Sequence, residues 1–127
     1  MTQITFIIPN AQWLSSNMRF PHWGAEHDRK KSLRLRGEIT GLASGLAFNT
    51  PVRVIAHIGY PTNATADPGN SAPTLKALID GMTRAGIWVD DDSKHLIGPD
   101  YRRDPNKAPK GHHTVRLEIE PLNTEET

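Results

Sequence analysis

Alternating and β-branched runs of apolar residues predict the strands of a small sheet. The segment 4–8 (Ile-Thr-Phe-Ile-Ile) is β-branched and aromatic and ends at Pro9, which is typical of a strand. The segments 51–60 and 114–119 alternate apolar with polar residues, as strands do when they bury one face. The segment 95–97 is a candidate for a further short strand. We therefore expect three or four strands, each with one face in the core.

Two longer segments repeat apolar residues at the spacing of an amphipathic helix. The first runs from about 25 to 47, and its apolar stripe is predicted to face the core. This stripe consists of Leu35, Ile39, Leu42 and Leu46. Glycines at 37, 41 and 45 weaken the helix, because glycine loses more backbone freedom than other residues. The second helix runs from about 73 to 85, and Gly86 supplies its C-terminal stop. Its stripe consists of Leu75, Leu78, Ile79, Met82 and Ala85.

The predicted order of elements, β-α-β-α-β-β, is that of a small α/β (α+β) domain with a mixed sheet. A chain of 127 residues has the length of one domain, so residues 1–127 are expected to form a single unit. Its apolar runs are far shorter than the roughly 20 residues of a membrane span, and we expect no signal peptide. The chain has no cysteine, which excludes disulfides, zinc-thiolate sites and cysteine nucleophiles. This composition fits a cytoplasmic protein.

Charges are unevenly distributed along the chain although they almost cancel. The formal net charge is +1, from 15 Lys and Arg against 14 Asp and Glu. Basic residues gather in the segments 29–36 and 102–110, whereas three aspartates stand together at 90–92. Such a pattern suits an enzyme that acts on a polyanion, because cations hold phosphate while acids hold metal. The alternative is that both groups are ordinary solvated faces.

The three consecutive aspartates are candidate ligands of a metal ion. Two unit negative charges about 4 Å apart repel by about 4 kcal/mol at an effective dielectric near 20, and Mg²⁺ neutralises such groups through one or two carboxylates. In an extended segment Asp90 and Asp92 share one face while Asp91 faces the other. A further ligand must then come from elsewhere, and Asp67, in the loop before the second helix, is the best candidate. The alternative is that Asp67 belongs to an Asx turn and that the aspartate triplet is a solvated loop.

The residues around these acids resemble a known family. Asp67-Pro68-Gly69-Asn70 is followed by the segment 73–82 (Pro-Thr-Leu-Lys-Ala-Leu-Ile-Asp-Gly-Met) and by 85–93 (Ala-Gly-Ile-Trp-Val-Asp-Asp-Asp-Ser). RusA-like Holliday junction resolvases have a similar series: an Asp-x-Asp-Asn loop, a helix with a lysine and an internal Asp, an Ala-Gly-apolar-aromatic turn, and an Asp pair that opens a strand. The resemblance covers about residues 60–100. It extends more loosely to an Asn-Arg element at Asn17 and Arg19.

The resemblance implies a nuclease that resolves four-way junctions or other branched DNA by Mg²⁺-dependent phosphodiester hydrolysis, with Mn²⁺ able to substitute. The implied metal ligands are Asp67, Asp91 and Asp92, and Lys76 is implied as a further catalytic residue that faces the scissile phosphate. The DNA-binding candidates are Asn17, Arg19 and Asn70 from the resemblance, with the basic residues Arg29, Lys30, Lys31 and Arg34 of the first helix. Two symmetric cuts imply a homodimer. The family suggests a bacterial, phage or prophage origin.

The chain departs from the family pattern at two positions. The family's second loop Asp is Gly69 here, and Lys76 lies six residues after Asn70 rather than three. A catalytically inactive DNA-binding module of the same fold is therefore the alternative function, and a structural or interaction protein is a third. Within the aligned Asp pair Asp92 is favoured over Asp91, but anchoring the alignment on the preceding tryptophan shifts the pair by one residue.

Several further residues allow two interpretations. Lys76 and Asp80 lie four residues apart on the second helix and fit a simple exposed pair as well as a catalytic role. Three ring side chains of the first loop are candidates for stacking on unpaired bases, although such residues often only pack. They are Trp13, His22 and Trp23. The adjacent His112 and His113 would point to opposite faces of a strand, which disfavours a histidine metal site.

Overall fold

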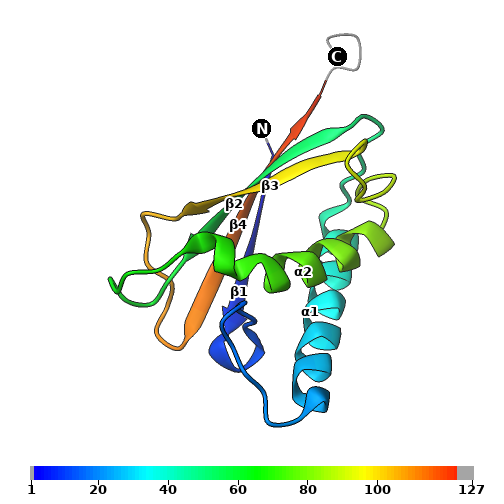
Figure 1. The fold of residues 1–127 in the computed structure, drawn as a ribbon. Helices are drawn as coiled ribbons and strands as arrows, with labels where there is room; N and C mark the ends of the chain where they lie inside the picture. The colour runs from blue at the N-terminus through cyan, green and yellow to red at the C-terminus, as the bar shows by residue number, and fades with distance from the viewer. Residues whose placement is uncertain (1, 123–127) are drawn as a thin grey trace.

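A four-stranded mixed sheet with two helices on one face forms the fold, which the computed structural model describes for residues 2–122 (Figure 1). The strands are β1 (Thr2–Pro9), β2 (Val52–Gly59), β3 (Leu96–Arg103) and β4 (His112–Pro121). The helices are α1 (Trp23–Ser44) and α2 (Ala72–Arg84), with two short 3₁₀ helices, η1 (Asn10–Gln12) and η2 (Pro68–Ser71). The predicted α+β class and the order β-α-β-α-β-β are confirmed.

The sheet has the strand order β1-β4-β2-β3. Strand β4 pairs antiparallel with both neighbours, so that Leu117 lies opposite Ile4 of β1 and Ala56 of β2. Strands β2 and β3 run parallel, which requires a crossover connection, and α2 provides it. Consequently η2 and the start of α2 follow the end of β2, while the segment after α2 leads back to the start of β3.

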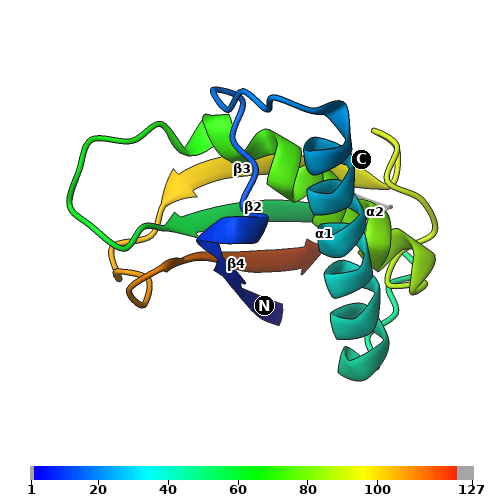
Figure 2. The same ribbon diagram turned by 90° about the horizontal axis from the view of Figure 1, so that it is seen from below.

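Both helices lie on one face of the sheet (Figure 2), and the side chains of that face are apolar and buried. Along β2 the side chains alternate, and Val52, Val54, Ala56 and Ile58 are fully buried. Alternation along β1 and β4 buries the corresponding residues of those strands, as the sequence predicts. From α2 the predicted residues Leu75, Leu78 and Met82 are also fully buried, so this helix forms the centre of the second layer.

Helix α1 buries a different face from the one predicted. The residues Leu35, Ile39 and Leu42 are 57%, 57% and 64% exposed, and the buried residues are instead Leu33, Gly37 and Gly41. A Cβ atom at Gly37 would overlap the backbone carbonyl of Leu78 in α2. The backbones of the two helices therefore touch, and Gly37, one of the three glycines that weaken the prediction, permits the contact.

Strand β3 is longer than the sequence predicts. It continues from Leu96 to Arg103, through a stretch that reads as the beginning of a polar loop. The reason is its position: β3 is an edge strand that pairs only with β2, and an edge strand needs few buried side chains.

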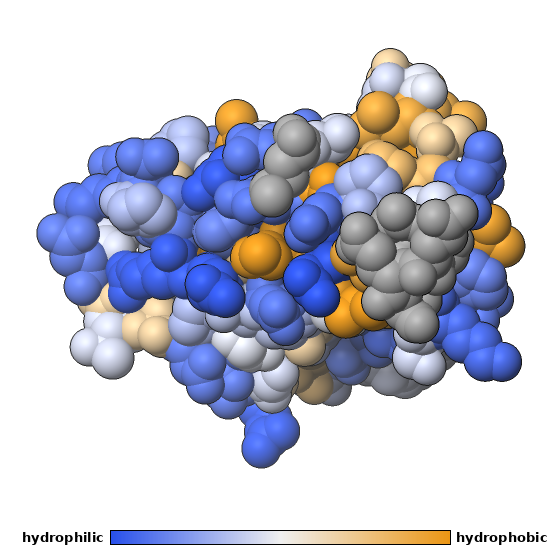
Figure 3. Space-filling view, turned by 90° about the horizontal axis from the view of Figure 1, so that it is seen from above, coloured by the Kyte–Doolittle hydropathy of each residue, from blue (hydrophilic) through white to orange (hydrophobic). Residues whose placement is uncertain are grey.

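The surface is mostly hydrophilic towards the loops that follow β2 and β3, and hydrophobic residues reach it at the opposite end of the molecule (Figure 3). Between residues 2 and 122, no helix combines the length and apolarity that crossing a membrane requires.

Candidate functional site

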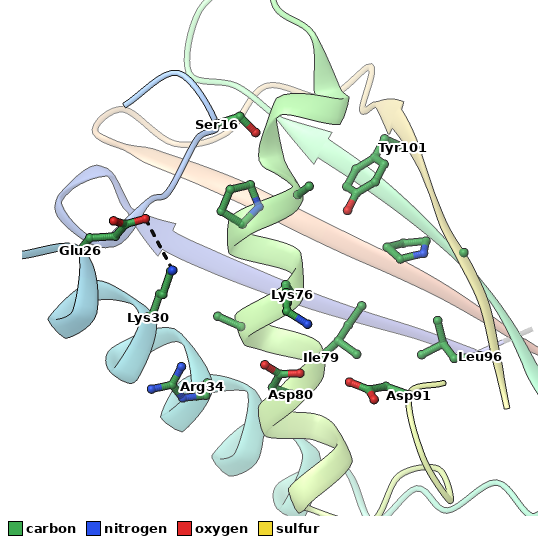
Figure 4. A pocket seen from close by; sticks show the side chains of 15 residues that line it. Ser16, Glu26, Lys30, Arg34, Lys76, Ile79, Asp80, Asp91, Leu96 and Tyr101 are labelled. Atoms are coloured by element: carbon green, nitrogen blue, oxygen red, sulfur yellow. Dashed lines mark ion pairs between the residues drawn. The ribbon is translucent and has the colours of Figure 1, made fainter. Parts of the chain in front are cut away.

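A pocket of about 720 Å³ lies over α2, between α1 and the edge strand β3 (Figure 4). Three cations and two acids that the sequence analysis singled out line it together. Lys30 and Arg34 come from α1, Lys76 and Asp80 from α2, and Asp91 from the segment between α2 and β3. The pocket thus joins residues that are far apart in the sequence, from Ser16 to Tyr101.

Asp80 and Asp91 lie on the α2 and β3 side of the pocket, and Glu26 of α1 is a third acid in its lining. The carboxylates of Asp80 and Asp91 point towards one another in Figure 4, with the ammonium group of Lys76 beside them. Within residues 2–122, neither carboxylate has a cationic partner within 4.0 Å. Lys76 and Asp80 are therefore not a closed ion pair, and all three groups are available to a ligand.

The cations on α1 divide between the pocket and other roles. Lys30 and Arg34 lie one turn apart and line the pocket, where Lys30 also contacts Glu26 at 3.5 Å. Such an exposed pair holds the lysine weakly. Arg29 points elsewhere: its guanidinium donates to the carbonyl of Trp13 at 2.8 Å and lies over a phenylalanine ring. Lys31 is exposed and lies outside the set of described residues that line the pocket.

Asp67 has a local structural role. It precedes η2 at the start of α2, whereas the aspartate triplet follows the end of that helix. Its carboxylate accepts a hydrogen bond from the backbone N–H of Gly69 at 3.0 Å and caps η2. This is the Asx turn that the sequence analysis kept as an alternative.

Asp92 is engaged in the turn that opens β3. Its carboxylate accepts hydrogen bonds from the backbone N–H groups of Lys94 and His95 at 3.0 and 3.1 Å, and it pairs with the His95 ring at 2.7 Å. The hydrogen bond from the His95 ring, with the backbone bonds, holds the pKa of Asp92 below its usual range. Asp92 therefore stabilises a turn, and its neighbour Asp91 is the member of the triplet that reaches the pocket.

The expected cluster of Asp67, Asp91 and Asp92 does not form. In the part of the chain that the structure describes, no group of three or more His, Asp or Glu side chains is placed to hold a metal ion. The physical reason is the length of α2, because a helix of 13 residues spans about 20 Å. The sheet does not fold either flanking segment back over it. Asp91 joins Asp80 instead.

The first loop lies beside η2 at one side of the pocket. The backbone N–H of Ser16 donates to the carbonyl of Asn70 at 2.9 Å, and Ser16 lines the pocket. Asn17 and Arg19 have exposed side chains, and like Asn70 they are not among the described residues that line the pocket. Of the predicted DNA-binding residues, Lys30 and Arg34 therefore line the pocket, and the others lie outside its described lining.

Several pocket residues were not predicted as part of the site, among them Asp80 and Tyr101. Asp80 carried a usable signal, because it lies one turn after Lys76 on the polar face of α2. Tyr101 carried none, since its segment reads as a loop. It lies half-buried on β3, its hydroxyl points into the pocket in Figure 4, and burial raises its pKa.

The ring side chains also divide between structure and surface. Trp13 is only 3% exposed, and its ring stacks on His113 with 4.3 Å between centroids. His113 in turn contacts Asn10 through its ring nitrogen at 2.7 Å. Trp13 therefore packs, and it is not available for stacking on a ligand.

Comparison of the chain with protein-family models gives no match, and comparison with curated proteins gives none either.

Proposed function

We propose that this chain is a Mg²⁺-dependent endonuclease that resolves four-way junctions or other branched DNA. The observation that supports the proposal best is the pocket over α2, where Lys30, Arg34 and Lys76 share one cavity with Asp80 and Asp91. A phosphodiester-cleaving site needs cations that hold phosphate and carboxylates that hold a hard metal ion. The resemblance to RusA-like resolvases points to the same reaction.

The cations would position the DNA backbone over the acids. Lys30 and Arg34 are one helical turn apart, about 6 Å along α1, and both face the pocket. The guanidinium of Arg34 offers paired donors that match phosphate, whereas the lysines act as point charges. Lys76 stands beside the two carboxylates. It would hold a phosphate oxygen close to groups that would otherwise repel it.

Asp80 and Asp91 are the residues that would hold Mg²⁺ or Mn²⁺, in place of the predicted set that included Asp67 and Asp92. Their chemistry fits such an ion, because Mg²⁺ usually takes one or two carboxylates and leaves positions for water and substrate phosphate. When bound, the ion would supply an activated water and would stabilise charge on the leaving oxygen. Resolution of a junction takes two symmetric cuts, so we further propose a C₂ homodimer.

Cleavage of a labelled four-way junction in the presence of Mg²⁺ tests the acids. We expect Asp80→Asn and Asp91→Asn to abolish cleavage and to retain junction binding, because the cationic contacts remain. Asp67→Asn and Asp92→Asn should still cleave, since these side chains serve local turns. Asp28→Asn, an exposed acid of α1 outside the described pocket lining, is the matched control. Wild-type rates in both the Asp80 and Asp91 variants would show that the site is assigned wrongly.

Binding experiments without metal test the substrate class. The chain should prefer four-way junctions to linear duplex of equal length, and its affinity should fall steeply as salt rises, because bound Lys and Arg displace condensed counterions. Equal affinity for both forms of DNA would exclude the resolvase function.

One observation favours a second candidate, the catalytically inactive DNA-binding module. Asp80 and Asp91 face one another in the pocket (Figure 4), and between residues 2 and 122 no third His, Asp or Glu joins them in a group that could hold a metal ion. A wild-type protein that prefers junctions but cuts neither a junction nor a supercoiled plasmid, with Mg²⁺ or Mn²⁺, would support this alternative.

A further inference from the structure

Trp23 is an exposed tryptophan without a structural role in the core. It is the first residue of α1 and is 84% exposed, whereas the other two tryptophans, Trp13 and Trp88, are 3% and 2% exposed. Among residues 2–122 it is the only exposed Phe, Tyr or Trp. Among the ring–ring contacts of the described residues, Trp23 has one, with His27. The two rings are tilted at 59°, and their centroids are 6.1 Å apart.

Trp23 shares a helix face with the cations of the pocket. Trp23, Lys30 and Arg34 stand at positions i, i+7 and i+11 of α1, which is the spacing of side chains on one face. Glu26, one turn after Trp23, lines the pocket with Lys30 and Arg34. Trp23 therefore lies one helical turn beyond the pocket, on the same face of α1 as the pocket residues Glu26, Lys30 and Arg34.

We propose that Trp23 stacks on an unpaired nucleobase of branched DNA whose neighbouring phosphates contact Lys30 and Arg34. The inference rests on the proposed function, because it assigns a substrate contact to the same site. An aromatic platform beside a cationic groove is the combination that binds unpaired strands, since every base offers a face to stack on. A paired base inside a duplex offers no such face to a side chain, so the contact favours branch points over linear duplex.

The tryptophan fluorescence of the native chain gives a direct test. Because Trp13 and Trp88 are buried, quenching by acrylamide reports mainly on Trp23. The probes are a four-way junction, a forked duplex with unpaired arms and a blunt duplex of equal length. We expect the fork, whose arms are unpaired, to protect Trp23 from acrylamide and the blunt duplex to protect it much less. Equal protection by all three probes, or none by the fork, would overturn the proposal.

Substitution tests the energetic role. Trp23→Ala should weaken binding of the fork by about 5- to 150-fold, the range for stacking of one base, without changing the salt slope. Trp23→Phe should restore most of the affinity. Lys30→Gln, the comparison variant, should instead weaken binding to every probe and reduce the salt slope by about one unit.

The outcomes separate this inference from the proposed function. If wild type prefers the junction and Lys30→Gln weakens binding, but Trp23→Ala has wild-type affinity for the fork, the stacking role is refuted while the proposed function stands. An equal loss for fork and blunt duplex in Trp23→Ala would also refute it. If the wild type binds none of the probes, both proposals fail.

Discussion

The close contact between α1 and α2 predicts that alanine cannot replace Gly37. A Cβ atom there would overlap the carbonyl oxygen of Leu78 and would lie 3.0 and 3.1 Å from the carbonyl and α carbons of the same residue. A Cβ at Gly81 would meet the carbonyl of Arg34 in the same way. Because backbone lies on both sides, no rotation of a side chain relieves the overlap. The helices themselves must separate, by about 1 Å at this point.

The magnitude follows from two opposing effects. Overpacking of a core typically costs about 1–3 kcal/mol, and a contact between two backbones belongs at the upper end of that range. Alanine in place of glycine inside a helix recovers about 1 kcal/mol. We therefore expect Gly37→Ala to lower the free energy of unfolding by about 2 kcal/mol, which corresponds to a fall in Tm of about 8 °C for a domain of this size.

Thermal and urea unfolding of Gly37→Ala, with Gly24→Ala as the matched control, measure this effect. Gly24 also lies in α1, but a Cβ there would have no atom within 4 Å. The control should therefore be as stable as the wild type, or more stable by up to about 1 kcal/mol. A Gly37→Ala protein that melts with or above the Gly24→Ala protein would refute the backbone contact between the helices.

Three further predictions concern other parts of the fold. Thr74→Val should cost about 2–4 kcal/mol in urea unfolding, and Thr74→Ser should restore it, because the buried hydroxyl bonds both the N–H and the C=O of Leu14 at 2.9 and 2.7 Å. Arg116→Ala should cost about 3 kcal/mol, since it leaves the buried Asp104 carboxylate without its partner at 3.1 Å; a loss below about 0.5 kcal/mol would contradict this. Burial lowers the pKa of His113, so the unfolded chain takes up a proton near pH 6.5 before the native chain does, and stability should fall as pH drops below that value. In His113→Phe this fall should be smaller between pH 7 and pH 5; an unchanged slope would exclude the effect.

The sequence predicts the sheet well because strand burial has a simple period. Alternation over 51–60 and 114–119 identifies β2 and β4 and their buried residues. The buried face of α1 was predicted wrongly for a related reason. A hydropathy pattern is set by large apolar side chains, and it does not detect a close helix–helix contact made at a glycine such as Gly37. The length of strand β3 was underestimated. This edge strand is held by backbone pairing with its neighbour β2, so its own side chains carry little of the strand pattern.

The candidate site was predicted in part. Four of the predicted residues, Lys30, Arg34, Lys76 and Asp91, line one pocket, and their roles in metal and DNA binding stay predictions. A local turn decides which of the three consecutive aspartates faces the pocket. The carboxylate of Asp92 already accepts hydrogen bonds within that turn, and sequence spacing does not predict these bonds. Whether Asp67 could reach across depended on the length of α2 and on the path of the chain around it, which are tertiary properties.

The exposed row of Leu35, Ile39 and Leu42 means that three of the most hydrophobic positions of α1 should tolerate substitution. Each of these leucines and isoleucines is more than half exposed, so exchange for glutamine or lysine removes little buried area and should scarcely affect folding. The glycines on the reverse side admit almost no other residue. Among sequences that share this fold, we therefore expect Leu35, Ile39 and Leu42 to vary freely and Gly37 to persist beside the buried Leu33, so that ranking positions by hydrophobicity would select three exposed positions as structurally essential and miss the glycine.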